Sequence, residues 1–316
     1  MTESGKITDE ALLELAAGCE KTIPLAISVS EQGKCALKVT WYQKQATEVL
    51  PEQFELGFEE VPVKTKDNQN QKAKEMMKRP DGTASFGWKE DDHYLTVSTE
   101  QFSYTYNKFT GLFEEMCYAN QNLLDRPMEL NIWRAPTDND RNIKNTWMRA
   151  QYDRTVTRAY ETTAKEGLHY ELSKSFVIPA EGVVGKISFV LHRYLDPEIT
   201  QRPFVIKMRL VENDDFRLVM ESECKLEFSD TELPRFGLRL FLPKSFAKLT
   251  YCGLGPVESY VDKHQASYHG VFHSTPAEQQ EDYIRPQENG SHYDCDYASL
   301  ASDRAVLTAV GEKTFS

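Results

Sequence analysis

The chain has 316 residues, of which 40% are hydrophobic and 11% aromatic, a composition typical of a globular protein with a large domain and a smaller piece. Its formal net charge of −12 repels nucleic acid and anionic membranes, so neither is expected as a partner. The polar N-terminus (MTESGKITDE) does not have the features of a signal peptide, and no apolar run is long enough for a membrane span. We therefore expect a cytoplasmic protein whose six cysteines are reduced.

The N-terminal part of the chain contains only a few strand patterns. Residues 9–17 predict a short helix or a turn, and Gln32-Gly33 predicts a turn between two strands. The expected strands are 23–30, 36–42 and 54–63. Because a small β-sandwich needs about seven strands, this part is expected to be the tail of a domain whose other strands lie upstream.

A polar, charged stretch over residues 64–82 ends in Pro-Asp-Gly and predicts a linker with room for a short helix. After it, the spacing of apolar residues predicts one helix, over residues 145–160, and otherwise strands. The expected strands are 94–98, 102–106, 112–118, 168–177, 184–194, 204–211, 216–228, 235–242 and 248–254. Turn-forming residues separate them, which is typical of an antiparallel sandwich.

Residues 131–140 (NIWRAPTDND) mark the passage from a buried strand into a structured loop. Pro136 has a fixed φ angle and favours an extended residue before it, so the strand is expected to end just ahead of this proline. The Asp-Asn-Asp triplet consists of turn-forming residues. Arg134 is expected to pair with Asp138 or Asp140 through a charge-assisted hydrogen bond. Such a pair either only ties down the loop or supports a functional site, and the residue types leave both interpretations open.

Two further stretches are rich in polar side chains. Residues 253–260 (GLGPVESY) do not have the third glycine of a dinucleotide fingerprint, and Glu258 is either a general acid or base or an acceptor for backbone N–H groups. Residues 283–290 (YIRPQENG) end in a strong turn signal and suit either sugar hydroxyls or the pinning of a loop. The histidines within residues 264–273 fall partly on an expected strand, and no cysteine pair has CxxC spacing, so no metal site is expected.

Three stretches occur in the order typical of one family. These stretches are NIWRAPTDND at 131–140, YCGLGPVESYVDKHQASYHGVF at 251–272 and EDYIRPQENGSHYDCDY at 281–297. Together they resemble the C-terminal β-sandwich domain, small-chain type, of LacZ-like β-galactosidases of glycoside hydrolase family 2. The resemblance extends well from about residue 85 to the C-terminus and is less distinct over the first 65 residues.

The resemblance implies an all-β fold in which a large antiparallel β-supersandwich of the galactose-mutarotase-like type follows the end of an immunoglobulin-like domain. The implied domains are a partial immunoglobulin-like segment over residues 1–65, a linker over 66–82 and the supersandwich over 83–316. The supersandwich is expected to be truncated at its C-terminus, because a late tryptophan loop that lines the galactose site in the family has no counterpart after Tyr297.

The resemblance also implies a function: a non-catalytic part of an enzyme that hydrolyses terminal non-reducing β-D-galactose residues from β-galactosides. In the family both catalytic carboxylates lie on a (β/α)8 barrel, as do the Mg and Na ions, and this chain has no strand–helix alternation of that kind. We therefore expect no catalytic residue and no cofactor in this chain, which is expected to be inactive alone. The expected partners are the catalytic barrel part, a lactose-type substrate in the complete enzyme, and further subunits in a homo- or hetero-oligomer.

In the family, the segment after the corresponding Asp-Asn-Asp resembles a mobile loop beside bound sugar. The implied substrate-proximal loop consists of Asp138, Asn139, Asp140, Arg141 and Asn142. The expected structural anchors are Trp133, Arg134, Pro136, Glu258, Arg285 and Glu288. The chain is thus expected to shape the mouth of the active site and the contacts between subunits.

Two other classes of function stay open at this point. A free-standing enzyme of the mutarotase or epimerase type needs an acid–base pair in a sandwich cleft. The candidates for that pair are Glu258 or Glu288 with His264, His269 or His292. A carbohydrate-binding module would instead use exposed tyrosine and tryptophan side chains.

Overall fold

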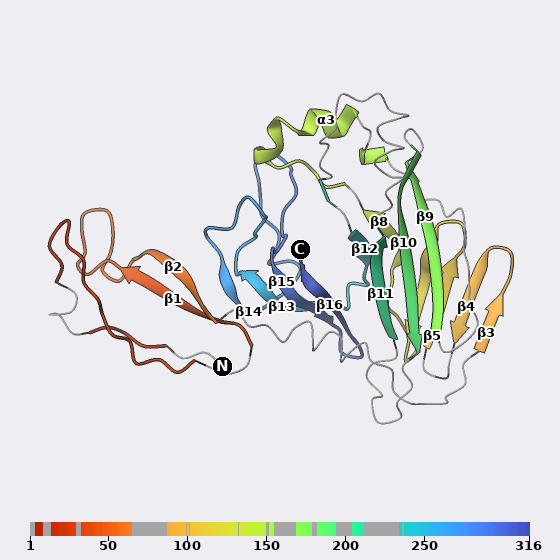
Figure 1. Cartoon of the computed structure of the whole chain (residues 1–316), viewed down its shortest axis with the longest axis horizontal. Helices are drawn as coiled ribbons and strands as arrows, with labels where there is room; N and C mark the ends of the chain where they lie inside the picture. Colours follow the sequence, from red (N-terminus) through yellow and green to blue (C-terminus); the bar gives the residue numbers. More distant parts are fainter. Residues whose placement is uncertain are drawn as a thin grey trace. The chain divides into compact units, whose positions relative to one another are not determined.

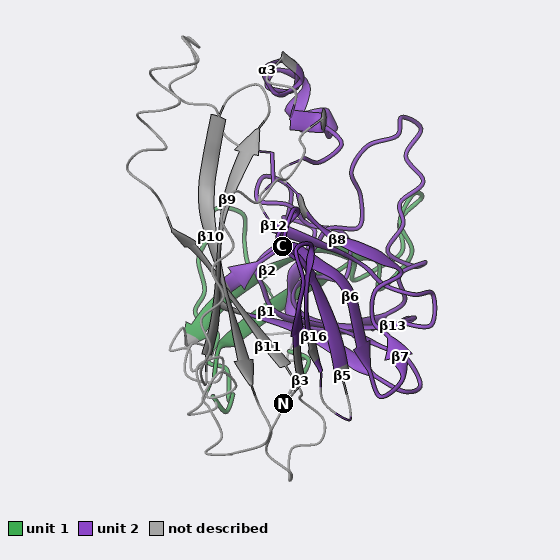
Figure 2. Ribbon diagram, turned by 90° about the vertical axis from the view of Figure 1, so that its right-hand side faces the viewer, with its two compact units in different colours: residues 1–69 green, residues 70–316 purple. Residues whose placement is uncertain are grey.

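A computed structural model describes most of the chain, and nearly all of its regular structure is β-strand (Figure 1). The described residues are 4–8, 14–29, 33–64, 87–98, 100, 102–131, 133–149, 152–154, 169–178, 182–193, 204–211, 234–235 and 237–316. The chain divides into two compact units, Met1–Gln69 (unit 1) and Asn70–Ser316 (unit 2), which Figure 2 draws in green and purple. The predicted linker over residues 66–82 and the predicted strand 216–228 lie outside the described residues.

The described residues of unit 1 contain one antiparallel hairpin, formed by β1 (Cys35–Tyr42) and β2 (Glu55–Lys64). In its register Leu37 faces Val61 and Trp41 faces Gly57. The strands predicted over 36–42 and 54–63 are therefore confirmed. The strand predicted over 23–30 is wrong as far as residues 23–29 are described, because they form no strand and the described sheet of this unit consists of β1 and β2 alone. Alternation of apolar residues is not sufficient where no neighbouring strand provides hydrogen bonds.

The first sheet of unit 2 is an antiparallel meander. Its strands, which neighbour one another in chain order, are β3 (Gly87–Glu90), β4 (Tyr94–Ser98), β5 (Phe102–Asn107), β6 (Leu112–Tyr118) and β7 (Gln121–Asn122). The Asp91 carboxylate accepts hydrogen bonds from the backbone N–H groups of His93 at 2.8 Å and Tyr94 at 2.7 Å, and thereby closes the turn before β4. Turn residues thus define where these strands begin, as the sequence indicates.

The other described parts of unit 2 form three more antiparallel sheets and short helical turns. Strand β8 (Arg126–Asn131) pairs with β12 (Gly237–Phe241), and β9 (His169–Ile178), β10 (Gly182–Arg193) and β11 (Phe204–Val211) form a second sheet. The third sheet has the order β14 (Tyr268–Ser274), β13 (Lys248–Gly255), β15 (Cys295–Ala301) and β16 (Val306–Phe315). The all-β antiparallel fold expected from the sequence is confirmed.

The helix predicted over 145–160 is only partly correct. The structure has α3 (Lys144–Arg149) and then a 3₁₀ turn, η2 (Tyr152–Arg154), and residues 155–160 lie outside the described part. Residues 152–154 therefore do not continue an α-helix. Among the described residues, no helix is both long and apolar enough to cross a membrane.

Within the described residues, one hydrophobic core joins the meander, the β8–β12 pair and the sheet of β13 to β16. Its centre comes from β4, β5 and β6, where Leu95, Tyr104, Tyr106 and Phe113 are at most 2% exposed. Met128 of β8 belongs to the same core, and leucines of β12, β15 and β16 pack against it. Full burial of one such side chain contributes about 1.5–3 kcal/mol. This core therefore fixes β8 and the sheet of β13 to β16 through β15 and β16, and the three loops described next lead from these strands.

Candidate functional site

Three loops meet in one hydrogen-bonded arrangement, which we call the loop network. Its members are residues 134–142 after β8, residues 256–267 between β13 and β14, and residues 281–290 before β15. Each loop comes from one of the three sequence motifs. Far-separated parts of the sequence are thus brought together by the sheet that contains β13, β14 and β15, and by β8, whose Met128 lies in the core against which β15 packs.

The first loop is organised by Asp140, whose residue is only 6% exposed. Its Oδ2 accepts hydrogen bonds from the Thr137 backbone N–H at 2.8 Å and from the Thr137 hydroxyl at 3.0 Å, while the Asp140 N–H donates to the Thr137 carbonyl at 3.0 Å. Its Oδ1 accepts from Arg134 Nη2 at 2.8 Å. Of the two partners expected for Arg134, the structure selects Asp140, because these contacts turn its carboxylate inward over the 3₁₀ helix η1 (Asp138–Arg141).

The Arg134 guanidinium lies among aromatic rings. Its centre is 5.9 Å from the ring of Trp147 and 5.6 Å from that of Tyr260, and Trp133 meets Trp147 edge to face at 6.4 Å. The side chains of Arg134 and Asp140 are 12% and 8% exposed, so this ion pair is largely removed from water. Removing one member of such a pair would leave a buried, uncompensated charge.

The first loop is fastened to the other two loops. Glu288 Oε2 accepts from the Ala135 N–H at 3.3 Å, and Gln287 Oε1 accepts from the Asp138 N–H at 3.0 Å. From the second loop, Asp262 Oδ2 accepts from Asn139 Nδ2 at 3.1 Å. Glu288 is itself held by Arg235, whose Nη1 lies 2.7 Å from Oε1. The backbone at Ala135 and Asp138 is therefore held by the third loop, and the Asn139 side chain by the second.

Glu258 is the most highly coordinated side chain of the loop network, and its residue is 8% exposed. Oε1 accepts from Lys263 Nζ at 2.5 Å and from the Tyr283 hydroxyl, and Oε2 accepts from the Gly290 N–H at 3.1 Å and the Tyr260 hydroxyl at 3.3 Å. A carboxylate has about four lone-pair positions. All of them are used by protein donors, which leaves none for a reacting proton.

These contacts also set the protonation of the group. Burial is the largest single influence and raises the pKa of Glu258, but the hydrogen bonds from Lys263, Tyr283 and the Gly290 N–H together outweigh it, so the pKa lies below its ordinary value. For Lys263 the balance has the same form: burial lowers the pKa, and the contacts with Glu258 and Tyr283 raise it above its usual range. Glu258 is therefore ionised and Lys263 protonated near neutral pH.

Local sequence explains why the second and third loops can approach each other. Gly253 lies where β13 passes β15, and a Cβ at this position would be 2.6 Å from Cys295 Sγ and 2.9 Å from its Cα. Gly290 has φ +71° and forms the turn expected from Asn-Gly. Ser259, fully buried, ties the second loop to the end of β13 and to the chain just after the third loop: its hydroxyl donates to the Leu254 carbonyl at 3.0 Å and accepts from the Tyr293 N–H at 2.8 Å.

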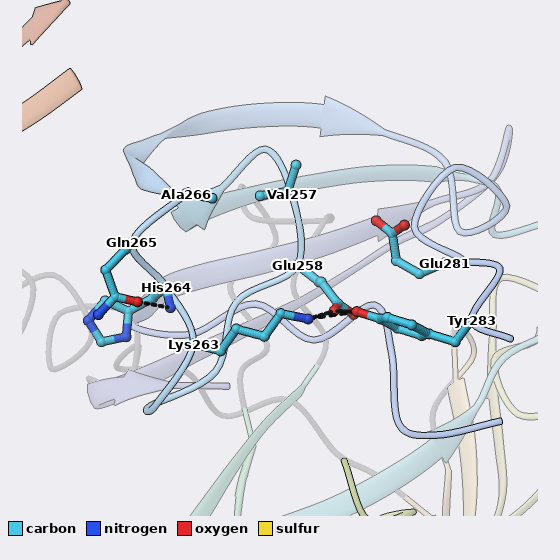
Figure 3. A pocket seen from close by; sticks show the side chains of 8 residues that line it. All are labelled: Val257, Glu258, Lys263, His264, Gln265, Ala266, Glu281 and Tyr283. Atoms are coloured by element: carbon cyan, nitrogen blue, oxygen red, sulfur yellow. Dashed lines mark hydrogen bonds and ion pairs between the residues drawn. The ribbon is translucent and has the colours of Figure 1, made fainter. Parts of the chain in front are cut away.

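Two pockets adjoin the loop network. One, of about 410 Å³, opens beside Glu258 between the second and third loops, where Figure 3 shows Lys263, Glu258 and Tyr283 converging with their polar ends. The other has about 420 Å³ and is lined by Asp138, Asp282, Tyr283, Ile284, Arg285 and Gln287. The second pocket thus touches the predicted substrate-proximal loop at Asp138, and it includes Arg285, one of the expected anchors.

The histidines proposed for a mutarotase-type pair have other partners. His264 Nδ1 contacts the Tyr260 carbonyl at 3.0 Å, and His269 Nε2 contacts Asp294 Oδ2 at 2.7 Å. His292 lies between the Leu254 carbonyl and the Gln279 side chain, stacked on Tyr251, and burial lowers its pKa. Among the described residues, no group of three or more His, Cys, Asp or Glu side chains is arranged to hold a metal ion.

The predicted site residues are distributed unequally over this arrangement. Asp140 is buried, whereas Asp138, Asn139, Arg141 and Asn142 are exposed on the first loop. Sequence reasoning missed several members of the network, among them Asp262, Lys263, Tyr283 and Gln287. The motif at 283–290 contains two of them, but its residue types alone did not indicate which side chains face the other loops.

Comparison with known proteins adds a finding about the family. Residues 98–316 match the family model for the β-galactosidase small chain. The chain is 31% identical over 312 residues to a β-galactosidase of Actinobacillus pleuropneumoniae, covering 97% of this chain and 28% of that protein. It is 30% identical over 265 residues to a β-galactosidase of Staphylococcus xylosus, with 84% of this chain and 24% of that protein covered. The chain therefore spans about a quarter of the length of these relatives.

Proposed function

The chain belongs to the β-galactosidase small-chain family, and on that premise we propose that it is a non-catalytic part of an enzyme that hydrolyses terminal non-reducing β-D-galactose residues from β-galactosides. The proposed partner is the catalytic barrel part of the same enzyme, in a cytoplasmic homo- or hetero-oligomer. Any Mg or Na ions that the reaction uses are assigned to that barrel. The chain's own contribution is to shape the mouth of the active site and subunit contacts.

The observation that carries this proposal is the support of the first loop. Its backbone is held by Glu288 and Gln287 of the third loop, and its Asn139 side chain by Asp262 of the second. The side chains of Asp138, Arg141 and Asn142 are exposed. A fixed backbone that presents polar side chains suits the hydroxyl groups of a sugar, because little conformational entropy is lost when they bind.

The chemistry of the carboxylates supports a non-catalytic role. A retaining glycosidase needs two carboxyl groups that can exchange a proton and form a bond with the sugar. Glu258 has its acceptor positions filled by four donors, and Glu288 is held by Arg235 and the Ala135 N–H. The same saturation disfavours Glu258 as the acid or base of a free-standing mutarotase.

The test is to measure hydrolysis of a chromogenic β-galactoside by the purified chain alone and after mixing with a catalytic barrel part. A suitable barrel part is the Actinobacillus pleuropneumoniae relative without the region to which this chain is similar. We expect no turnover from either piece alone and hydrolysis after mixing. Turnover by the chain alone within the usual enzyme range of about 1–10³ s⁻¹, abolished by Glu258→Gln, would contradict the proposal.

A further inference from the structure

One side chain holds both ends of the segment that supports the first loop. Glu258 Oε1 accepts from the Tyr283 hydroxyl, and Oε2 accepts from the Gly290 N–H at 3.1 Å. Between these two attachment points lie Gln287 and Glu288, the residues whose side chains bind the backbone of the first loop. The positions of Gln287 and Glu288 therefore depend on Glu258, although Glu258 bonds to Tyr283 and Gly290 and not to these two residues.

A second route runs through the turn at residues 260–263. Tyr260 and Lys263 exchange backbone hydrogen bonds at 2.9 and 3.1 Å, and both donate side-chain hydrogen bonds to Glu258. Asp262 lies inside this turn and accepts from Asn139 Nδ2 of the first loop. The ring of Tyr260 also lies 5.6 Å from the Arg134 guanidinium. Glu258 thus fixes the turn that reaches the first loop from the other side.

We propose that Glu258 is a positioning residue for galactoside binding: it sets the first loop, through residues 283–290 and 260–263, without touching the substrate. The inference rests on the proposed function, since it assumes that residues 138–142 contact the sugar. Glu258 is 8% exposed and its acceptor positions are filled, so it acts only through the residues that it holds.

A carboxylate is needed in this place for a geometric reason. Two hydroxyls, an ammonium group and a backbone N–H converge on it from two loops. An amide at this position has only one acceptor oxygen, so Glu258→Gln can no longer accept hydrogen bonds at both ends of the group, while the side-chain volume is kept. Tyr283→Phe is milder, because it removes one hydroxyl that joins Glu258 to Lys263.

The experiment compares Glu258→Gln, Tyr283→Phe and Glu281→Gln in the enzyme assembled from this chain and its catalytic part. Glu281 lines the same pocket as Glu258, and its exposed side chain makes Glu281→Gln a matched control. We expect KM for the galactoside to rise by about threefold or more in Glu258→Gln and Tyr283→Phe, with kcat nearly kept. A displaced first loop should weaken binding of the substrate and of the transition state equally, which raises KM and leaves kcat unchanged. KM should be unchanged in Glu281→Gln.

A second readout does not depend on activity. In the chain alone, tryptic cleavage after Arg141 should become faster in Glu258→Gln and Tyr283→Phe, and not in Glu281→Gln, since a loosened loop opens more often. A lower kcat with unchanged KM would indicate a loss of folded enzyme and would overturn the inference, as would unchanged KM in Tyr283→Phe. If the assembled wild-type enzyme hydrolyses no galactoside, the proposed function fails and takes the inference with it.

Discussion

In the hairpin of unit 1 apolar side chains are exposed, whereas in the loop network of unit 2 charged side chains are buried. None of the described residues of unit 1 is buried, and Trp41 and Val61 are 50% and 47% exposed although they belong to strands. In the loop network the charged residues Asp140 and Glu258 are 6% and 8% exposed. Exposed apolar strands and buried charges are both departures from the usual distribution, and both carry information.

The difference shows which region has its interactions complete within this chain. Each buried carboxylate of the loop network is matched by donors on the chain itself, so its geometry is strongly specified. A two-stranded hairpin with exposed apolar faces is at best marginally stable by itself. Substitutions in the loop network should therefore have large effects on stability, and those in the hairpin small ones.

The sharpest test of this comparison is Asp140→Ala against Asp138→Ala, two acidic residues of the same 3₁₀ turn. Asp140→Ala leaves the Arg134 guanidinium buried without its counter-charge and should cost about 3 kcal/mol of unfolding free energy. Asp138 is exposed, so its replacement should stay within about 0.5 kcal/mol. Urea unfolding followed by tryptophan fluorescence measures both. Equal costs for the two variants would contradict the view that the buried pair holds the loop.

A smaller effect is expected in the pH dependence that Glu258 contributes. Its pKa in the folded chain is below the ordinary value of 4.5, since its hydrogen bonds outweigh burial, whereas the unfolded chain restores the ordinary pKa. As the pH falls through 4.5, the unfolded state binds more protons, so this contribution to stability is present above that pH and is lost as the pH falls through the folded pKa. The unfolding free energy of Glu258→Gln should therefore lie furthest below that of the wild type near pH 7.

The measurement for this prediction is urea unfolding at a series of pH values between neutrality and about pH 3, a range set by carboxyl pKa values. Other carboxylates titrate in both proteins, so the difference in unfolding free energy between wild type and Glu258→Gln reports on Glu258. That difference should narrow on acidification. A difference that stays constant over the whole range would mean that the ionised form of Glu258 is not favoured by folding.

The strands were predicted best from the sequence where turn-forming residues flank them. Strands β4 and β6 have the predicted bounds, because Asp91 and Gly111 close the turns that precede them. Residues 23–29 have the same alternation but no ladder partner in the described sheet. A pattern in one segment says which side chains suit a strand, and the partner strand decides whether it forms.

In the candidate site, local contacts were easier to predict than distant ones. The choice of Asp140 by Arg134 was within reach, because Thr137-x-x-Asp140 is close to a capping box and turns that carboxylate back onto the chain. The pairing of Glu258 with Tyr283 was not, since it joins two loops that only the β13 to β15 sheet brings together. Glu258 and Glu288 were expected as anchors, but their partners came from the fold.

A small change in unfolding free energy is also expected for Trp41→Ser with Val61→Ser, which removes two exposed apolar side chains from one face of the hairpin. They share that face because Trp41 pairs with Gly57 and Leu37 with Val61 in the same register. The cost should stay within about 1 kcal/mol, since these side chains are half exposed already.

Exposed apolar strands favour association, so the chain should self-associate at high concentration and the double variant less so. Light scattering checks this, with Thr40→Ser on the opposite face as control, and a wild-type chain that stays monomeric would show that the exposed hairpin face does not drive association.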